Sequence, residues 1–477
     1  MINVKRKEGS ILRITRVLEE PSRDSLELYL YVPDELGLTT DVISEDALYH
    51  SALHGKRFYF SAEHQLPLVR SQLDGQGQLD NDRYRLNLSL YAFQFVTAQE
   101  QTTRDLVERF RDEEENNDAS PEELAQHLDI LESILRRLRR NEPGDQRRHK
   151  YFINIDNYTS WFTQQEILAL LAELPSKPAY AAVRERMLSL CEREERYRED
   201  KQYNSQRVRE SATRMSNKMR LLRRLIEFPI TLKDKPKELG GGEKRLVKAL
   251  VTGLVMMVIS GLVLELRVYF VNITIWFFLA LAVLYAVREV FKEDLRQTLW
   301  RWVRKGRPKW RKRYRDPDTN AVVGVQREWF EIIKPRKVAP IINDARHSNV
   351  SQRGETVLHY RSSARMLPTR FLSGYSQTRE ILTLDLNVLR NLMEPGNHRV
   401  YTLKEGNVDL RQVERRYQFN LIARSQQGAY PADIQRFKIV MNRSRILDVE
   451  EIVRDENGQR RAEGALQPAN ELSERTS

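Results

Sequence analysis

Two long apolar runs lie one after the other in the middle of a chain that is otherwise strongly charged. They cover residues 246–264 and 268–287, and only Glu265, Leu266 and Arg267 separate them. Each run has about the 20 residues that a helix needs to cross roughly 30 Å of hydrocarbon. Because the separating segment is so short, the two runs predict antiparallel transmembrane helices that form a hairpin.

Lysine and arginine residues are concentrated outside this predicted hairpin. Lys244 and Arg245 precede it and a dense basic stretch covers 288–315, whereas the connection between the runs contains only Arg267. The positive-inside rule therefore places both flanks and both termini in the cytoplasm, which in a bacterium means an integral protein of the inner (plasma) membrane. The alternatives are a re-entrant hairpin and a helix pair buried in a soluble core.

Composition limits the membrane part to a small insert. Charged residues make up 31% of the chain and its mean hydropathy is −0.60, while 477 residues exceed the roughly 250–300 that one core can hold. The net charge of +12 suits a nucleic-acid binder, a membrane-surface protein or basic cytoplasmic loops. A single cysteine, Cys191, excludes an intramolecular disulfide and fits a reducing compartment.

The basic stretch after the second run predicts an amphipathic juxtamembrane helix. Apolar residues recur at three- and four-residue intervals there, and Gly306 and Pro308 are expected to end the helix. We expect its basic and aromatic residues to bind anionic lipid headgroups: Arg296, Arg301, Arg304, Lys305, Arg307, Lys309, Arg311, Trp300, Trp302 and Trp310. Such a stretch can also bind nucleic acid, but its position beside an apolar run favours lipid.

These patterns together predict a multi-domain α+β membrane protein. The two-helix transmembrane hairpin would be flanked by strand-rich cytosolic domains and by a charged, partly coiled-coil helical region. The expected order is a strand-rich domain at 1–98, the helical region at 99–228, a flexible basic linker at 229–245, the hairpin at 246–287, the juxtamembrane helix at 288–315, a strand-rich domain at 316–454 and a disordered tail at 455–477.

Local patterns define several of these elements. Ile11–Leu18 and Ser25–Val32 are rich in β-branched and aromatic residues, and apolar residues alternate with polar ones over Tyr84–Leu90, which predicts three strands. Ser120 opens a capping box that predicts a helix start. Leucines over 124–138 then follow the 4,3 spacing of about two heptads, which fits either oligomerisation or packing within one subunit.

The sequence contains no common catalytic or nucleotide-binding signature. Sequences such as HExxH, GxSxG, GxGxxG and the P-loop are missing. His50 and His54 have the i, i+4 spacing that can place two imidazoles on one helix face, and His64 follows, so these three are weak candidates for a metal site. Surface histidines explain the pattern more simply, and Cys191 lies at an apolar helical position that predicts a buried thiol.

The leading hypothesis is a non-enzymatic sensing or scaffolding protein, without a cofactor, that is anchored in a membrane and binds a partner at its cytoplasmic face. That partner would be another protein or a second copy of the chain. One alternative is an oligomeric membrane effector or channel-like protein gated by its cytosolic domains. The other is an enzyme whose site the short motifs do not reveal.

Overall fold

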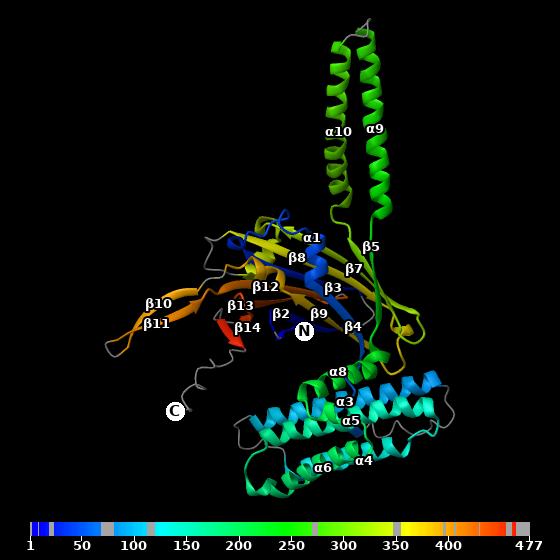
Figure 1. The fold of residues 1–477 in the computed structure, drawn as a ribbon, viewed down its shortest axis with the longest axis vertical. Helices are drawn as coiled ribbons and strands as arrows, with labels where there is room; N and C mark the ends of the chain where they lie inside the picture. The colour runs from blue at the N-terminus through cyan, green and yellow to red at the C-terminus, as the bar shows by residue number, and fades with distance from the viewer. Residues whose placement is uncertain are drawn as a thin grey trace.

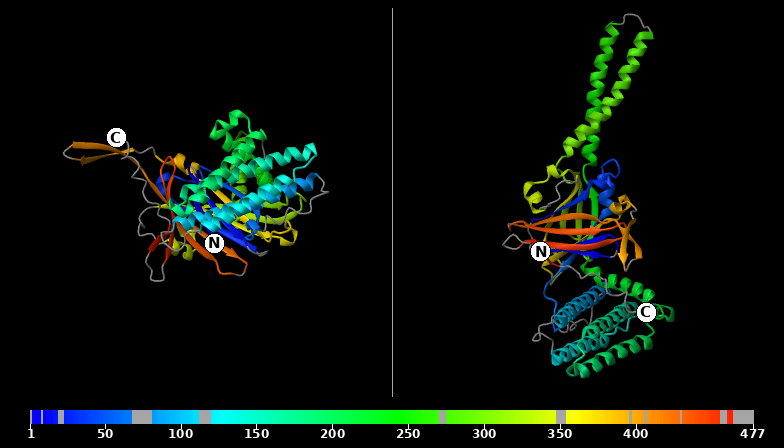
Figure 2. Two further views of the ribbon diagram at one scale, coloured as in Figure 1. Left: turned by 90° about the horizontal axis from the view of Figure 1, so that it is seen from below. Right: turned by 90° about the vertical axis from the view of Figure 1, so that its left-hand side faces the viewer.

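The computed structural model describes residues 2–7, 9–18, 23–67, 81–111, 120–269, 275–346, 354–394, 397–404, 407–428, 430–454 and 460–463. Three parts follow one another along the long axis of the molecule (Figure 1). A long pair of helices stands at one end, a β-sandwich forms the middle, and a helical domain lies at the other end. Figure 2 shows the same order from the side.

Two antiparallel sheets form the sandwich. The smaller sheet has the order β1 (Ile2–Lys7), β2 (Ile11–Leu18), β9 (Gln377–Asp385) and β4 (Leu53–Phe60). The larger has the order β15 (Arg460–Glu463), β14 (Ile446–Arg454), β13 (Asp433–Met441), β12 (Tyr417–Gln427), β3 (Arg23–Pro33), β8 (Glu355–Met366), β7 (Val322–Ile333), β6 (Trp310–Arg315) and β5 (Lys233–Glu238). A separate ribbon pairs β10 (Asn397–Lys404) with β11 (Asn407–Glu414).

The main core lies between the two sheets. Leu12 and Ile14 of β2 and Leu384 of β9 share one buried cluster with Leu28 of β3 and Phe419 of β12. Alternate residues of a strand point to opposite faces, so apolar residues at every second position bury one face of each sheet. Short helices at the sandwich are α1 (Glu45–Ala52), α11 (Pro340–Arg346) and α12 (Asn387–Leu392), with 3₁₀ turns at Asp34–Leu36, Pro335–Lys337 and Pro368–Arg370.

Strands from the two flanks of the chain share the same sheets. β2 pairs with β9, and β3 lies between β8 and β12. The two strand-rich regions therefore form one body rather than two separate domains. The predicted strand at Tyr84–Leu90 is wrong, because these residues lie inside a helix.

The helical domain contains α3 (Asn81–Arg111), α4 (Pro121–Arg140), α5 (Gln146–Glu173), α6 (Ala181–Asp200), α7 (Gln206–Arg209) and α8 (Ala212–Glu227), with 3₁₀ turns at Pro178–Tyr180 and Phe228–Ile230. The helix start at Ser120 is confirmed, since its side chain accepts a hydrogen bond from the Glu123 amide. The leucines of α4 from Leu124 to Leu138 are buried in one cluster with α3 and α5. Packing inside the chain thus accounts for their heptad spacing.

Helices α9 (Gly241–Tyr269) and α10 (Ile275–Arg304) lie side by side and project from the sandwich (Figure 1). Val247, Val251, Val255 and Ile259 of α9 recur every four residues and form one buried stripe, against which residues of α10 such as Leu284 pack. β5 leads into α9, and β6 follows α10. Residues expected to form a flexible linker and the end of a juxtamembrane helix are therefore strands of the larger sheet.

The predicted two-helix transmembrane hairpin is wrong. Glu265–Arg267, the expected connection, lies inside α9, so less of the second apolar run is left to α10. The apolar part of α10 has thirteen residues from Ile275 to Val287 before Arg288, and these span about 20 Å, less than the ~30 Å of a bilayer core. Among the described residues, only Gly241–Val268 is a helix long and apolar enough to cross a membrane.

The predicted fold class therefore fails at its central element. The expected tail at 455–477 lies outside the described residues apart from β15.

A set of buried charges joins the two sheets. Arg16 of β2 contacts Glu380 of β9 at 2.5 Å and Asp24 of β3 at 2.7 Å, and Arg57 of β4 lies 3.2 Å from Glu380. Gln326 donates to the same carboxylate at 3.0 Å. Burial alone would raise the pKa of Glu380, but the charges of Arg16 and Arg57 outweigh it and lower the pKa to about 2. Glu380 is therefore ionised inside the core.

We predict that Glu380→Gln destabilises the sandwich by about 3 kcal/mol, because it leaves Arg57 buried without its carboxylate. Hydrogen exchange of peptides from β2 and β9 at pH 7 measures the loss. Glu394→Gln is the control: Glu394 pairs with Arg415 on the surface, with 72% of its side chain exposed, so its loss should cost under about 0.5 kcal/mol.

Glu380→Gln should also change how steeply the free energy of unfolding falls at acid pH. The pKa of Glu380 is lowered on folding, so its contribution is complete above the ordinary value of 4.5 and disappears as the pH falls towards 2. Asp24 acts in the opposite direction because burial raises its pKa. Denaturant unfolding between pH 5 and 2.5 should show a shallower loss in Glu380→Gln, and an unchanged slope would contradict this account.

Candidate functional site

The strongest candidate site is the basic end of the helical domain, where α4 ends and α5 begins. Residues 136–150 hold seven basic and two acidic side chains: Arg136, Arg137, Arg139, Arg140, Arg147, Arg148 and Lys150 against Glu142 and Asp145. Two open clefts flank this stretch. One lies between α4 and α6, and the other between α3 and α5.

The α4–α6 cleft has a volume of about 360 Å³. Its lining is basic, with Leu135 and Leu190 forming an apolar patch, and its charged members are Arg136, Arg139, Arg140, Arg193, Glu132 and Glu194. Arg193 lies 2.9 Å from Glu132, so part of the positive charge is neutralised within the cleft.

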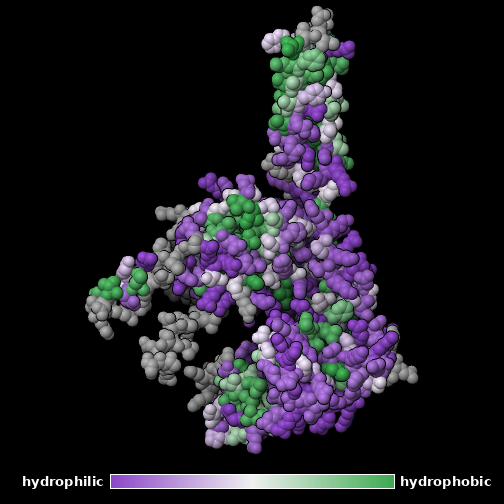
Figure 3. All heavy atoms as spheres, viewed as in Figure 1, coloured by the Kyte–Doolittle hydropathy of each residue, from purple (hydrophilic) through white to green (hydrophobic). Residues whose placement is uncertain are grey.

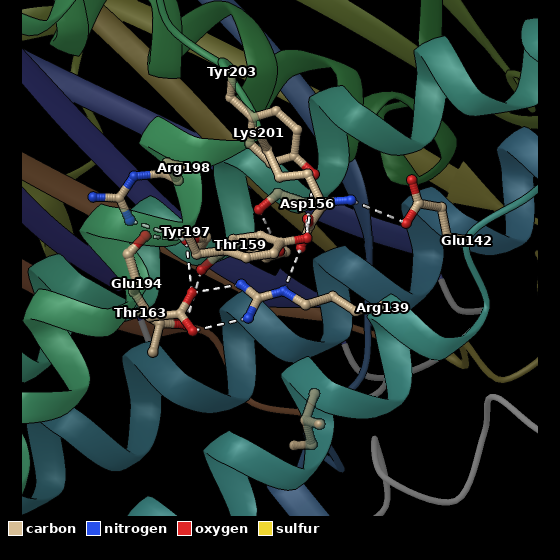
Figure 4. Close-up of polar contacts among 12 residues, drawn as sticks. Arg139, Glu142, Asp156, Thr159, Thr163, Glu194, Tyr197, Arg198, Lys201 and Tyr203 are labelled. Carbon is tan, nitrogen blue, oxygen red and sulfur yellow. Dashed lines mark hydrogen bonds and ion pairs between the residues drawn. The ribbon is translucent and has the colours of Figure 1, made fainter.

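Beneath this cleft lies a polar network that links α4, α5 and α6 (Figure 4). Arg139 of α4 donates two hydrogen bonds to the carboxylate of Glu194 in α6, at 3.0 and 2.6 Å. Its Nε donates to Asp156 of α5 at 3.3 Å, and its guanidinium lies 3.7 Å from the ring centroid of Tyr197. Burial would lower the pKa of Arg139, but Glu194 and Asp156 raise it, so Arg139 stays charged.

Asp156 is fully buried and accepts hydrogen bonds from two phenols. The hydroxyls of Tyr197 and Tyr203 donate to its Oδ2 at 2.8 and 2.7 Å. Burial and the charge of Asp156 raise the pKa of both tyrosines, that of Tyr197 to about 12. Both phenols therefore remain protonated donors at neutral pH.

The network continues on the far side of Glu194. Ser160 donates to Glu194 at 2.7 Å, and Arg198 donates to Ser160 at 3.0 Å and also to Gln164. Burial lowers the pKa of Arg198. Because these groups already bind one another, the network holds three helices in register and fixes Arg139 at the floor of the cleft.

The α3–α5 cleft has a volume of about 420 Å³ and a greater excess of positive charge. Its four basic residues are Arg85, Arg147, Arg148 and Lys150, and its acidic residue is Asp82. Cations fixed on helices around a concave surface create a potential that attracts anions. This cleft can therefore bind an anionic group.

Several residues predicted to bind lipid headgroups lie elsewhere. Trp310 is only 2% exposed and stacks on Tyr49 with 3.6 Å between ring centroids, so the prediction for Trp310 is wrong. It belongs to β6, whose alternation turns it into the core. Lys309 forms an ion pair with Glu45 and donates to the Phe330 carbonyl at 3.0 Å, so it links the base of α10 to the sandwich.

Other predicted residues support the helix pair itself. Trp300 packs against the buried stripe of α9, and Arg304 donates to the Leu239 carbonyl. Arg296 contacts Glu293 at 3.0 Å, and Arg307 contacts Glu243 at 3.2 Å.

The remaining predicted residues differ in exposure. Trp302 is 73% exposed and Lys305 is exposed, whereas Arg311 lies in β6. The side chain of Arg301 lies outside the described residues.

The three candidate histidines do not form one site. α1 ends at Ala52, so His50 lies on the helix while His54 lies in β4. His64 packs against Phe93, and burial lowers its pKa. Within the described residues, no group of three or more histidine, cysteine, aspartate or glutamate side chains is arranged to bind a metal ion.

The prediction of a buried thiol at Cys191 is confirmed, and burial raises its pKa to about 11.

In comparisons with known proteins, no family model, no curated protein and no solved structure matches this chain.

The basic stretch 136–150 is not among the residues predicted from the sequence, because the leucine spacing of α4 is the more regular pattern there. The available signal was the density of charge, with four arginines in the five residues from Arg136 to Arg140.

We predict that Glu194→Ala loosens the α4–α6 contact, because Arg139 and Ser160 lose a shared acceptor. The expected loss is about 2 kcal/mol, since the Arg139 side chain is partly exposed. Hydrogen exchange of α4 and α6 peptides measures it. Glu192→Ala on the same helix is the control, because Glu192 is 66% exposed and pairs with Arg196 at the surface at 3.0 Å. Equal effects of both substitutions would refute the role of the network.

Proposed function

We propose that this chain is a non-enzymatic, membrane-anchored scaffolding protein. Helix α9, which among the described residues is the one helix long and apolar enough to cross a membrane, holds it at a lipid bilayer with α10 packed beside it, and the helical domain binds a partner in the cytoplasm. The observation that carries this proposal is the apolar surface that the helix pair exposes to solvent, seen in the upper part of Figure 3.

Large apolar side chains are exposed along both helices of the pair. Exposed apolar side chains include Leu246, Leu250, Leu254, Met257, Val258, Leu264, Trp276, Phe278, Leu279 and Val283. Contiguous exposed apolar patches beyond a few hundred Å² mark contact with a partner or a membrane. α9 is mostly exposed, which distinguishes it from the core helix of a soluble protein.

Charged residues surround the base of the same helix pair. Lys244 and Arg245 lie near the start of α9, and Arg288, Lys292 and Arg296 follow the apolar part of α10. An apolar segment bordered by basic residues matches the change from hydrocarbon to anionic headgroups. This order supports lipid as the material that covers α9 and α10.

The partner-binding part of the proposal rests on the opposite end of the molecule. The helical domain lies beyond the sandwich from the α9–α10 pair (Figure 1). A ligand bound to its basic clefts would therefore remain in the aqueous phase while the chain is anchored. The positive-inside rule supports the cytoplasm as the side on which this phase lies.

We predict that the double substitution Leu250→Glu and Leu254→Glu releases the protein from membranes. These side chains are 61% and 57% exposed, and each carboxylate in hydrocarbon costs about 3 kcal/mol. Sedimentation after an alkaline carbonate wash measures the membrane-bound fraction, which should fall at least about tenfold.

The matched control is Leu188→Glu with Leu221→Glu, which adds the same charge at exposed apolar positions of α6 and α8. The control protein should stay in the pellet. Retention of the α9 variant in the pellet would contradict membrane anchoring by this helix pair.

A second candidate function, that of an oligomeric membrane effector, is favoured by the β10–β11 ribbon. Tyr401 pairs with Leu410 and Leu403 with Val408 on one face, and these four side chains are 66%, 46%, 77% and 70% exposed. A two-stranded ribbon alone is only marginally stable, and an apolar face can meet its own copy across a two-fold axis.

If the ribbon joins two copies, Leu403→Lys with Val408→Lys should convert an oligomer into a monomer. Light scattering after size exclusion in detergent measures the mass of the protein. Arg399→Glu keeps the apolar pairs and is expected to keep the oligomer. A monomeric unsubstituted protein would remove this second candidate.

A further inference from the structure

We infer that the α3–α5 cleft is a binding site for a soluble ligand that carries phosphate groups. That the cleft binds phosphate does not depend on membrane anchoring, whereas the choice of a soluble ligand over a lipid headgroup rests on the proposed anchoring by α9 and α10. It rests on the charges, the fixed side chains and the size of the cleft.

The cleft holds four basic residues and one acidic residue. Arg85 and Asp82 are 4.0 Å apart, and the Asp82 side chain is 83% exposed, so this ion pair neutralises little of the charge. The α4–α6 cleft differs, because Arg139 binds Glu194 in two hydrogen bonds and Arg193 binds Glu132. The positive charge of the α3–α5 cleft is therefore the less compensated of the two.

Two of the four cations are held in place by neighbouring side chains. Arg148 donates from Nε to Asn81 at 2.7 Å, and its guanidinium lies 5.6 Å from the ring centroid of Tyr84. Arg85 lies 5.1 Å from the ring centroid of Tyr151, whose hydroxyl hydrogen-bonds with Ser89. Arginines that are already ordered lose less conformational entropy when an anion binds.

The other two cations, Arg147 and Lys150, are exposed at the cleft. Within the part of the chain that the structure describes, neither forms an ion pair. Asp145 already caps α5, since its carboxylate accepts from the Arg148 amide at 3.1 Å. The binding capacity therefore comes from the side chains and not from the helix N-terminus.

Phosphate matches this set of donors better than a carboxylate does. A phosphate group carries more charge and three strongly accepting oxygens, and arginine forks bind two of them at once. The volume of about 420 Å³ exceeds one phosphate and lies in the range of small-ligand sites. The amide of Asn154 at the wall can bind the organic part of such a ligand.

The position of the cleft separates a soluble phosphate from a lipid headgroup. The helical domain is at the far end of the sandwich from the apolar helix pair (Figures 1 and 2). A bilayer that covers α9 and α10 would not reach it. A soluble phosphate compound and a lipid headgroup offer the same phosphate group, and we assign the cleft to the soluble compound.

The test is isothermal titration of the full-length protein in detergent with inorganic pyrophosphate and, separately, with ATP. We expect saturable binding of at least one of these probes. The double substitution Arg147→Ala with Lys150→Ala should weaken that binding about tenfold or more, because it removes two charge-assisted contacts. Arg136→Ala with Arg140→Ala removes the same charge from the α4–α6 cleft and should leave the affinity within about twofold.

Four outcomes would overturn the inference. They are no saturable binding of either probe up to millimolar concentration, equal weakening by both double substitutions, binding only to vesicles that contain anionic phospholipid, and binding only to single-stranded RNA. Hydrogen exchange of α3 and α5 in each variant shows that the helices are still folded, so that a loss of affinity reports on the cleft.

Discussion

Strand β3 comes from the N-terminal part of the chain and pairs with β8 and β12 from the C-terminal part. The rest of the architecture depends on this pairing. Leu28 lies opposite Tyr360 of β8 on one side and opposite Ala423 of β12 on the other. Since a one-residue slip would turn the buried face outwards, both ladders must form in one register. The chain between these strands leaves the sandwich twice, as the helical domain between β4 and β5 and as the α9–α10 pair between β5 and β6. The pairing of β5 with β6 then fixes the base of α9 and α10.

Buried charges strengthen this dependence. Arg16, Asp24 and Glu380 come from β2, β3 and β9, so their contacts form only when both sheets have assembled. A buried ion pair stabilises little compared with an apolar pair of the same volume, but an incomplete one is costly. The cluster therefore favours the assembled sandwich over alternative pairings. In the helical domain, Arg139 and Glu194 have a comparable role between α4 and α6.

Local signals in the sequence predicted some elements well. The strand predicted at Ile11–Leu18 has the bounds of β2, and the cap at Ser120 forms as expected, because both depend on neighbouring residues alone. The strand predicted at Tyr84–Leu90 is wrong because this alternation is short, whereas Tyr84, Leu88, Tyr91 and Phe95 are buried at helical spacing. The charges at Glu265–Arg267 did not end α9. The acidic partner of Arg139 is Glu194 of α6, which lies far away in the sequence, so no local signal shows that this charge is compensated.

In the proposed function, lipid contact and ligand binding lie at opposite ends of the sandwich. The most direct test is the collision accessibility of nitroxide labels, measured by electron paramagnetic resonance in liposomes. The labels would be attached to Val258→Cys and Arg147→Cys in a Cys191→Ala background. The account predicts that oxygen dissolved in lipid reaches the label at 258 while a water-soluble nickel chelate reaches only the label at 147. Free access of the chelate to position 258 would contradict the account.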